Sequence, residues 1–249
     1  MQAEIFKEQS LSLNEIRSFH QNGFLGPYTL FDHHESVDIC SHIDSLLFGE
    51  HKLDNEHKNF HNRHLEDEIL LNLSLRSNLS DKATRLLGDD ALLWRTHFWN
   101  KKPGSTELPW HQDYNYWPIE PSIVVSAWVA FDDIDQENAC VQLIPKSHRK
   151  ILPHIDCGGK DNFGFIKKAD PDTFEAKDII NMELKAGQYF LFNERMLHHS
   201  NPNKSNRRRL GMAIRIISGI TEVMDYDSEN HVLYPYNKPN TMGLNKLAL

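Results

Sequence analysis

The sequence predicts a mainly β protein, a sandwich or barrel, with helices packed outside it. Helical patterns fill the first third of the chain. Short β-branched and aromatic segments with turn residues between them follow from about residue 91. Helices that could connect parallel strands are missing between these segments. The 249 residues are 39% hydrophobic and 25% charged, without an internal repeat or linker, so we expect a single domain over 1–249.

Residues 1–90 are predicted to form mainly helical support. Ser12 and Glu15 have the spacing of a capping box, which opens a helix that runs to Gly23. Apolar residues between 37 and 47 fit one face of a second helix. Ser80 is the predicted N-cap of a short helix that ends at Gly88.

The predicted β core spans residues 91–218. Its candidate strands are 91–99, 123–131, 140–144, 188–192 and 210–217. Proline and glycine residues separate them, as in sheets built from short strands. The stretch 149–185 is long, polar and poorly periodic. We expect it to be an insertion that acts as a lid, because loops of this length are usually functional or mobile.

Composition excludes several classes of function. The net charge is −8, which argues against nucleic acid or an anionic membrane as a partner. No apolar run is long enough to span a bilayer, and the first residues lack the pattern of a secretory signal. The three cysteines, at 40, 140 and 157, share no CxxC spacing and indicate reduced thiols. We therefore expect a cytoplasmic protein that acts on a small molecule, with its oligomeric state left open.

Two short motifs could together hold a metal. In a strand, His111 and Asp113 would project from the same face, and His198 follows the predicted strand 188–192. Two histidines and one carboxylate suit a non-haem Fe(II) centre, which leaves sites for a keto acid and O2. Arg209, eleven residues after His198, could bind a distal carboxylate through its planar guanidinium. A His-x-Asp motif alone is weak evidence in a chain with 15 histidines, so the interpretation depends on all the pieces together.

The order and spacing of these motifs resemble the phytanoyl-CoA dioxygenase family of 2-oxoglutarate oxygenases. Residues 22–28 (NGFLGPY) also resemble the chlorinating-enzyme branch of that family. The resemblance extends over most of the chain in one order and spacing, and its matching segments are 101–104, 110–113, 127–130, 137–138, 144–148, 198–203 and Arg209.

The resemblance implies a double-stranded β-helix, the cupin-like jelly roll, with the N-terminal helices outside it. It implies Fe(II), 2-oxoglutarate and O2 as cofactor and co-substrates. His111, Asp113 and His198 would then hold iron and carry catalysis. The remaining cofactor-binding residues implied are Arg209 and Ser200, for the distal carboxylate of 2-oxoglutarate, and Trp128, which would line the cofactor pocket or serve as an ordinary core aromatic.

The sequence departs from the family pattern at three positions. His199 follows the second metal-binding histidine where glycine is usual. On a strand it would face away from His198, so it would lie outside the ligand set or be exposed. Lys146 and Ala139 replace glycines in turns, which changes loops and not the metal. A lysine at 101 or 102 could approach the cofactor, but we expect both to be solvated.

The substrate is the least determined part of the prediction. Tyr114, Asn115, Tyr116 and Trp117 follow the iron motif and could line the substrate side, or could be packing residues. Their mixture of polar groups suits hydroxylation of a small polar substrate such as an amino acid, amine or phosphonate.

Two alternatives remain open. One is a halogenase or hydroxylase that acts on an aminoacyl group tethered to a carrier protein, which the basic cluster 146–150 could contact if it is not simply a solvated turn. Another is a non-catalytic cupin-like binding protein. Asp113 argues against halogenation, because a halide needs the coordination position that the carboxylate fills. Arg209 argues against a binding protein, which has no need to bind a keto acid.

Overall fold

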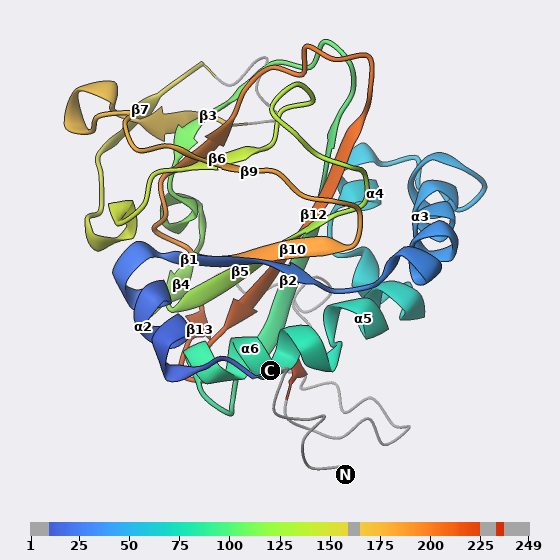
Figure 1. Ribbon diagram of the computed structural model, residues 1–249, viewed down its shortest axis with the longest axis horizontal. Coiled ribbons are helices and arrows are strands. Elements are labelled where there is room, and N and C mark those ends of the chain that lie inside the picture. The colour runs from blue at the N-terminus through green and yellow to red at the C-terminus, as the bar shows by residue number, and fades with distance from the viewer. Residues whose placement is uncertain (1–9, 159–164, 225–232, 237–249) are drawn as a thin grey trace.

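Two antiparallel sheets face one another in this protein (Figure 1). The structure is a computed structural model and describes residues 10–158, 165–224 and 233–236. The larger sheet has six strands in the order β1-β10-β5-β12-β2-β14, and the smaller has four in the order β3-β11-β6-β9. Neighbours that are distant in sequence, such as β2 and β12, are the mark of a jelly roll. The predicted fold class is therefore confirmed.

The larger sheet comprises β1 (Phe24–Thr29), β2 (Leu92–Lys101), β5 (Val124–Ala130), β10 (Gln188–Asn193), β12 (Arg209–Ile217) and β14 (Tyr234–Pro235). The smaller comprises β3 (Leu108–His111), β6 (Val141–Leu143), β9 (Ile180–Met182) and β11 (His198–Ser200). Two further pairs are β4 (Ile119–Glu120) with β13 (Glu222–Val223), and β7 (His154–Asp156) with β8 (Lys167–Ala169). All five predicted strands are present. The bounds of the other strands were not predicted, although His111 and His198 were each considered on a strand.

The helices are α2 (Leu13–Asn22), α3 (His33–Phe48), α4 (Glu56–Phe60), α5 (Glu68–Ser74) and α6 (Ser77–Leu87). Short 3-10 turns are η1 (Arg63–Leu65), η2 (Asp113–Tyr116), η3 (Ser147–Arg149) and η4 (Pro171–Thr173). The predicted capping box at Ser12 is present. The prediction for Ser80 was wrong: α6 begins at Ser77, so Ser80 lies inside the helix. No helix in the described ranges is long and apolar enough to cross a membrane.

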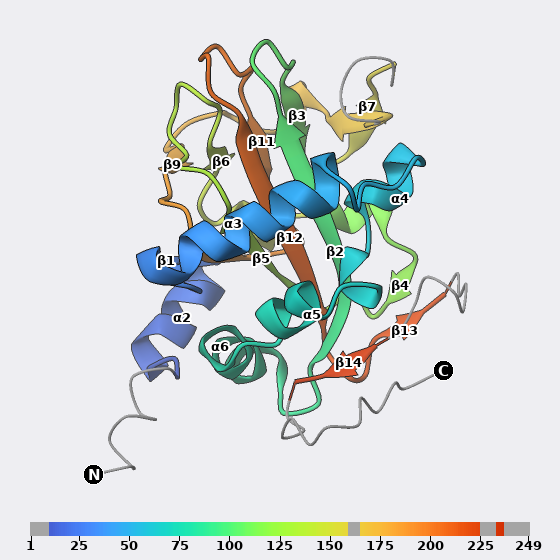
Figure 2. The ribbon, with the colours of Figure 1, turned by 90° about the vertical axis from the view of Figure 1, so that its right-hand side faces the viewer.

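The helices cover the outer face of the larger sheet (Figure 2). Successive side chains on a strand point to opposite faces, so every second residue of β12 contributes to this contact. Leu210, Met212, Ile214 and Ile216 pack there in one core with residues of α2, α3, α5 and α6. Each such buried aliphatic side chain contributes about 1.5–3 kcal/mol.

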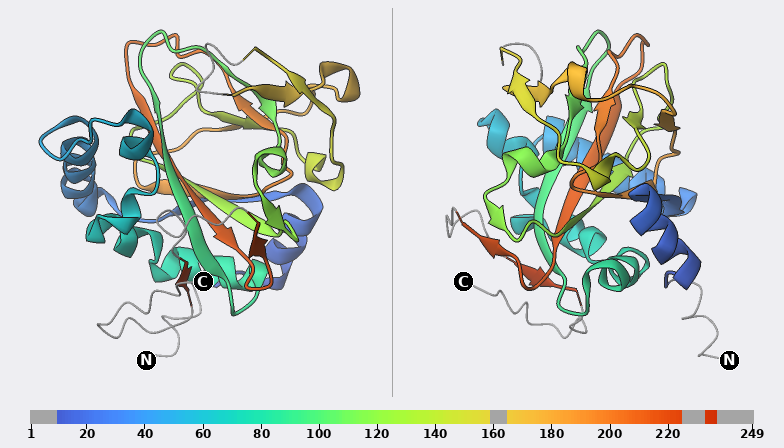
Figure 3. Two further views of the ribbon diagram at one scale, coloured as in Figure 1. Left: turned by 180° about the vertical axis from the view of Figure 1, so that it is seen from behind. Right: turned by 90° about the vertical axis from the view of Figure 1, so that its left-hand side faces the viewer.

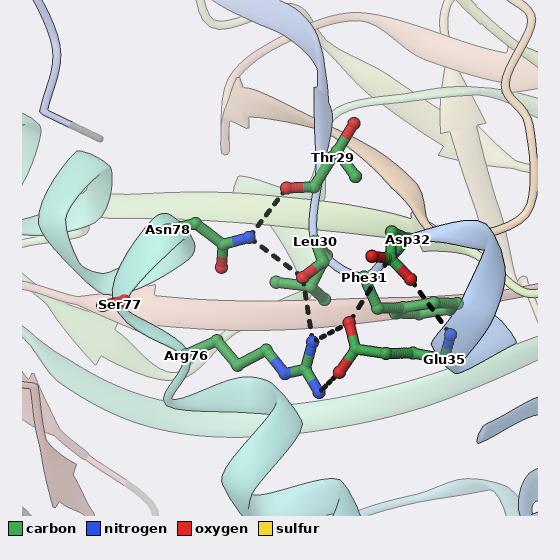
Figure 4. A pocket seen from close by; sticks show the side chains of 8 residues that line it. All are labelled: Thr29, Leu30, Phe31, Asp32, Glu35, Arg76, Ser77 and Asn78. Carbon is green, nitrogen blue, oxygen red and sulfur yellow. Dashed lines mark hydrogen bonds and ion pairs between the residues drawn. The ribbon is translucent and has the colours of Figure 1, made fainter. Parts of the chain in front are cut away.

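A polar joint fixes α3 and α6 against the end of β1 (Figure 4). Arg76 donates two hydrogen bonds to Glu35, at 2.9 and 2.7 Å. Asn78 donates to the carbonyl oxygens of Thr29 and Leu30 at 2.7 and 2.9 Å. These contacts hold the helices in place, and we assign the surface hollow at this joint to that structural role.

The stretch 149–185 contains regular structure in its described part. The strands β7 and β8 pair with each other, and β8 lies beside β3 (Figure 3). Strand β9 pairs with β6 and belongs to the smaller sheet. The expected insertion is thus anchored at several points, and its movement as a lid stays a prediction.

Candidate metal centre and cofactor pocket

The pairing of β3 with β11 brings His111 and His198 together. They are partners across the two antiparallel strands, and their ring centroids lie 4.1 Å apart. Both side chains are buried, with 1% and 8% of the surface of each residue exposed. Two residues 87 positions apart in the sequence thus become neighbours through sheet register alone.

Asp113 reaches the same point from a turn. The expectation that it shares a strand with His111 was wrong, because β3 ends at His111 and Asp113 begins η2. Gln112 between them remains extended, so the carboxylate still approaches the imidazole. Asp113 Oδ1 lies 3.6 Å from His111 Nε2 and 3.9 Å from His198 Nε2. The ligand atoms of the three residues all lie within 4.8 Å of one another, close enough to share one ion.

Backbone carbonyl groups orient both imidazoles. His111 Nδ1 lies 2.7 Å from Pro109 O, and His198 Nδ1 lies 2.8 Å from Met196 O. Each Nδ1 therefore donates its proton to a carbonyl, which assigns the lone pair to Nε2, the atom that faces Asp113. Burial lowers the pKa of His198 to about 3, so its ring is neutral at neutral pH, as a metal ligand must be. The three residues fit a divalent metal.

Arg215 is a residue of the site that the sequence analysis missed. Its Nη2 lies 3.0 Å from Asp113 Oδ2. Burial alone would raise the pKa of Asp113, but Arg215 and the two histidines outweigh it and lower that pKa. A signal was present: Arg215 lies six positions after Arg209, at the even spacing that places two residues on one face of a strand.

Arg209 and Ser200 form a second polar region between the sheets. Arg209 is 2% exposed, and its Nε and Nη2 have no hydrogen-bond partner among the described residues. The Ser200 hydroxyl likewise has none. A buried cation without partners costs several kcal/mol, so this pair suits an anionic ligand that completes it. The arrangement fits the distal carboxylate of 2-oxoglutarate.

Trp128 and Lys101 complete the walls of this region. The Arg209 guanidinium lies 5.4 Å from the Trp128 ring centroid. Gly211 leaves room for that ring, because a Cβ there would lie 2.1 Å from the indole. The expectation that Lys101 is solvated was wrong: it is fully buried on β2, opposite Arg209, and Nζ donates to the carbonyl oxygen of Ser200 at 3.1 Å. Burial lowers the pKa of Lys101 to about 6.

His199 points away from the metal centre. It stacks on Trp110 with ring centroids 4.0 Å apart, and its Nε2 bonds to Gln142 Oε1. The side chain is 8% exposed, so it is a buried packing residue and not an exposed one. His198 and His199 cannot exchange roles without a one-residue shift of the strand.

A cavity of roughly 200 Å³ adjoins Asp113. Of the four predicted substrate residues, Tyr116 and Trp117 line it. Tyr114 instead stacks against Arg195, and Asn115 bonds to His154. The other lining residues, which the sequence analysis missed, are His61, Arg95, Thr96, His97, Trp99, Phe165 and Arg215.

The predicted basic cluster is partly engaged in the fold. The Lys146 N–H donates to Asn22 O at 2.9 Å, and His148 Nε2 lies 3.2 Å from His20 O. The turn thus packs against the end of α2 through its backbone and His148, while Lys146, Arg149 and Lys150 remain exposed.

The geometry defines the class: a jelly roll with a candidate metal site of two histidines and one carboxylate, and a buried arginine with unpartnered nitrogen atoms. The family model described as phytanoyl-CoA dioxygenase (PhyH) matches residues 19–211. The chain therefore belongs to the phytanoyl-CoA dioxygenase family, as the sequence motifs predicted.

Curated relatives agree with this assignment. A phytanoyl-CoA dioxygenase domain-containing protein 1 homolog of Dictyostelium discoideum is 29% identical over 136 residues, which cover 53% of this chain and 48% of that protein. An ectoine dioxygenase of Bordetella bronchiseptica is 26% identical over 222 residues, covering 79% and 72%. The chain spans about half the length of several curated relatives that it matches.

Solved structures share the fold. The non-heme monooxygenase ThoJ, in its apo form, superposes with a TM-score of 0.75 at 23% identity, covering 92% of this chain and 85% of that one. CytC3 with Fe(II) and alpha-ketoglutarate superposes with a TM-score of 0.70 at 22% identity, covering 96% and 93%. The expected cofactors agree with the family and with what that second structure contains.

Proposed function

We propose that this protein is an Fe(II)- and 2-oxoglutarate-dependent oxygenase that hydroxylates a C–H bond of a small polar molecule. The observation that supports this most directly is the paired arrangement between the two sheets. Three ligand atoms from β3, β11 and η2 lie close together, and β12 of the other sheet carries a buried arginine with unpartnered nitrogen atoms. A structural metal would need the first feature but not the second.

Each residue has a distinct role in this proposal. His111 Nε2, His198 Nε2 and the Asp113 carboxylate would hold the iron, and the carbonyl oxygens of Pro109 and Met196 keep the two rings oriented. Arg209 and Ser200 would bind the distal carboxylate of 2-oxoglutarate, with Trp128 beside them. When bound, the iron supplies the oxidation in which substrate, O2 and 2-oxoglutarate give hydroxylated product, succinate and CO2.

The cavity next to Asp113 would hold the substrate, with Tyr116 and Trp117 in its wall. Phe165, from the predicted lid, closes one side: its ring centroid lies 4.4 Å from that of His111. Tyr116 also donates to Lys167 O at 2.5 Å, which links the lid to the metal motif. We propose that residues 149–185 exclude water from the substrate, within one oxygenase domain that spans the chain.

The test combines binding with turnover. Fe(II) should bind to the purified protein in an equimolar amount, and 2-oxoglutarate should then bind without oxygen. With O2 and a suitable substrate, the protein should convert 2-oxoglutarate to succinate in an iron-dependent reaction. Failure to bind either Fe(II) or 2-oxoglutarate would reject the oxygenase and favour a non-catalytic binding protein.

Hydroxylation is favoured over halogenation by Asp113. Its carboxylate fills the third protein position at the metal, and a second anion beside it would be repelled in a dry pocket. Mass spectrometry of products formed in saturating chloride or bromide should show hydroxylated product alone. A dominant halogenated product would overturn this assignment. A carrier-tethered substrate is a separate prediction, which a comparison of free and carrier-bound aminoacyl groups would test.

A further inference from the structure

The cavity beside Asp113 is unusually rich in arginine for a small site. Arg215 on β12 and Arg95 on β2 are partners across the two strands, and both line the cavity. Like charges directly opposite one another destabilise a sheet unless something compensates them. Among the residues that line the cavity, Asp113 is the one acidic residue, and it contacts Arg215.

One arm of the Arg215 guanidinium has no hydrogen-bond partner among the described residues. Its Nη2 contacts Asp113 Oδ2 at 3.0 Å, whereas Nη1 is buried and has no hydrogen-bond partner among the described residues. The side chain is 9% exposed. Its guanidinium carbon lies 5.0 Å from the Trp117 ring centroid and 5.7 Å from that of Phe192, which fixes its plane. A fixed, buried donor beside a cavity is suited to an anionic ligand.

The formal charges of the residues that line the cavity also favour an anionic ligand. With neutral histidines, two arginines and one aspartate give the cavity lining a charge of 2 − 1 = +1. Burial lowers the pKa of His61 to about 4 and that of His97 well below its usual value, so both rings are neutral. Bound Fe(II) and 2-oxoglutarate carry +2 and −2 and leave this balance unchanged.

We propose that the substrate of this site is an oxyanion, a carboxylate or phosphonate, whose charged group bonds to Arg215 Nη1. The proposal rests on the oxygenase function proposed above and names its substrate class. Because the other arm of the same guanidinium contacts Asp113, the carbon to be oxidised lies within a few bonds of the oxyanion. Trp99, Trp117 and Phe165 in the cavity wall give the body of the substrate an aromatic surface.

A binding experiment with matched probes tests this without knowledge of the natural substrate. The protein is loaded with Fe(II) and saturating 2-oxoglutarate in the absence of O2, so that the Arg209 region is filled. Propionate, phenylacetate and phenylphosphonate are titrated calorimetrically, with propionamide and phenylacetamide as neutral counterparts. We expect at least one acid to bind about ten- to a hundredfold more tightly than its neutral counterpart.

Variants assign that preference to Arg215. In Arg215→Gln the ratio of acid to amide affinity should fall to near one, and in Arg215→Lys it should fall several-fold, because the second donor arm is lost. Arg207→Gln, which removes an exposed arginine paired with Asp135, is the matched control and should keep the ratio. The ratio of acid to amide affinity is informative because each acid and its amide bind beside the same iron. If the substitution displaces Asp113, both affinities change alike and the ratio does not.

The outcomes separate this proposal from the one it rests on. If the unmodified protein does not bind Fe(II) or 2-oxoglutarate, the proposed oxygenase function is refuted. Normal loading without any preference for acids would overturn the oxyanion proposal alone. A preference that survives in Arg215→Gln would also overturn it, and would leave Arg215 as a residue that positions Asp113.

Discussion

The two faces of β12 differ sharply, although they belong to the same nine residues. The outer face, with Ile214 among its residues, is packed against helices in a continuous apolar core. The inner face presents Arg209 and Arg215, both buried, with nitrogen atoms that lack partners among the described residues. The outer face stabilises the fold. The inner face carries buried guanidinium groups with unpartnered nitrogen atoms, which bound anionic ligands would compensate. Strand alternation thus lets a single segment serve stability and binding separately.

The largest effect is expected at the metal ligands, which lie on the smaller sheet and its adjoining turn, away from the outer face of β12. Replacement of His111 or His198 with Ala should lower Fe(II) affinity by several orders of magnitude, because one of three ligands is lost while the outer core is untouched. Metal analysis after dialysis measures this, and circular dichroism checks the fold.

His199→Ala is the matched control for these variants, because its ring stacks on Trp110 away from the centre. It should bind iron like the unmodified protein. Equal iron content in His198→Ala and His199→Ala would show that the ligand assignment is wrong.

The next largest effect is expected for a substitution on the outer face of β12. Ile214→Ala should reduce the free energy of unfolding by about 2–5 kcal/mol, because Ile214 is fully buried and its removal leaves a cavity. Urea denaturation of the metal-free protein measures it. Iron and 2-oxoglutarate affinities of the folded fraction should stay within about twofold, since the side chain faces the helices. A large loss of ligand affinity with normal stability would contradict the division between the two faces.

A smaller effect is expected at Arg209. Arg209→Ala should raise the KM for 2-oxoglutarate about thirty- to a hundredfold, which corresponds to about 2–3 kcal/mol for a buried charged hydrogen bond. Removal of a buried guanidinium with two nitrogen atoms that lack hydrogen-bond partners should leave the free energy of unfolding unchanged or increase it.

Arg207→Ala is the control for Arg209, since Arg207 is exposed and paired with Asp135. Steady-state kinetics at saturating substrate would distinguish the two. An unchanged KM in Arg209→Ala with a large change in Arg207→Ala would move the binding role to the neighbouring arginine.

The smallest effect is expected in the amide hydrogen exchange of the predicted lid, 149–185. Peptides containing His154–Asp156 and Lys167–Ala169 should exchange amide hydrogens a few-fold more slowly when 2-oxoglutarate and an oxyanion probe are both bound. Peptides from α3 serve as a reference and should not change. Equal exchange in the free and loaded protein would make 149–185 a static part of the wall.

The sequence was sufficient for regular elements and for residues whose type dictates their chemistry. Long apolar strands such as 210–217 and the capping box at Ser12 depend on local pattern, and both were found. Strands β3 and β11 were missed, because they are short and their pairing is decided by distant partners. Ser80 was misassigned as a cap because its chemistry suits both a cap and a helix interior.

The sequence by itself determined the family, the jelly-roll class and the three candidate metal ligands, because each depends on residue types in a fixed order. The tertiary structure alone decided how those ligands meet, through the register that sets His111 opposite His198. It also decided that Lys101 and Arg215 are buried beside the site. The physical reason is that burial and charge pairing depend on which segments pack together, and a linear pattern records only the face on which a residue lies.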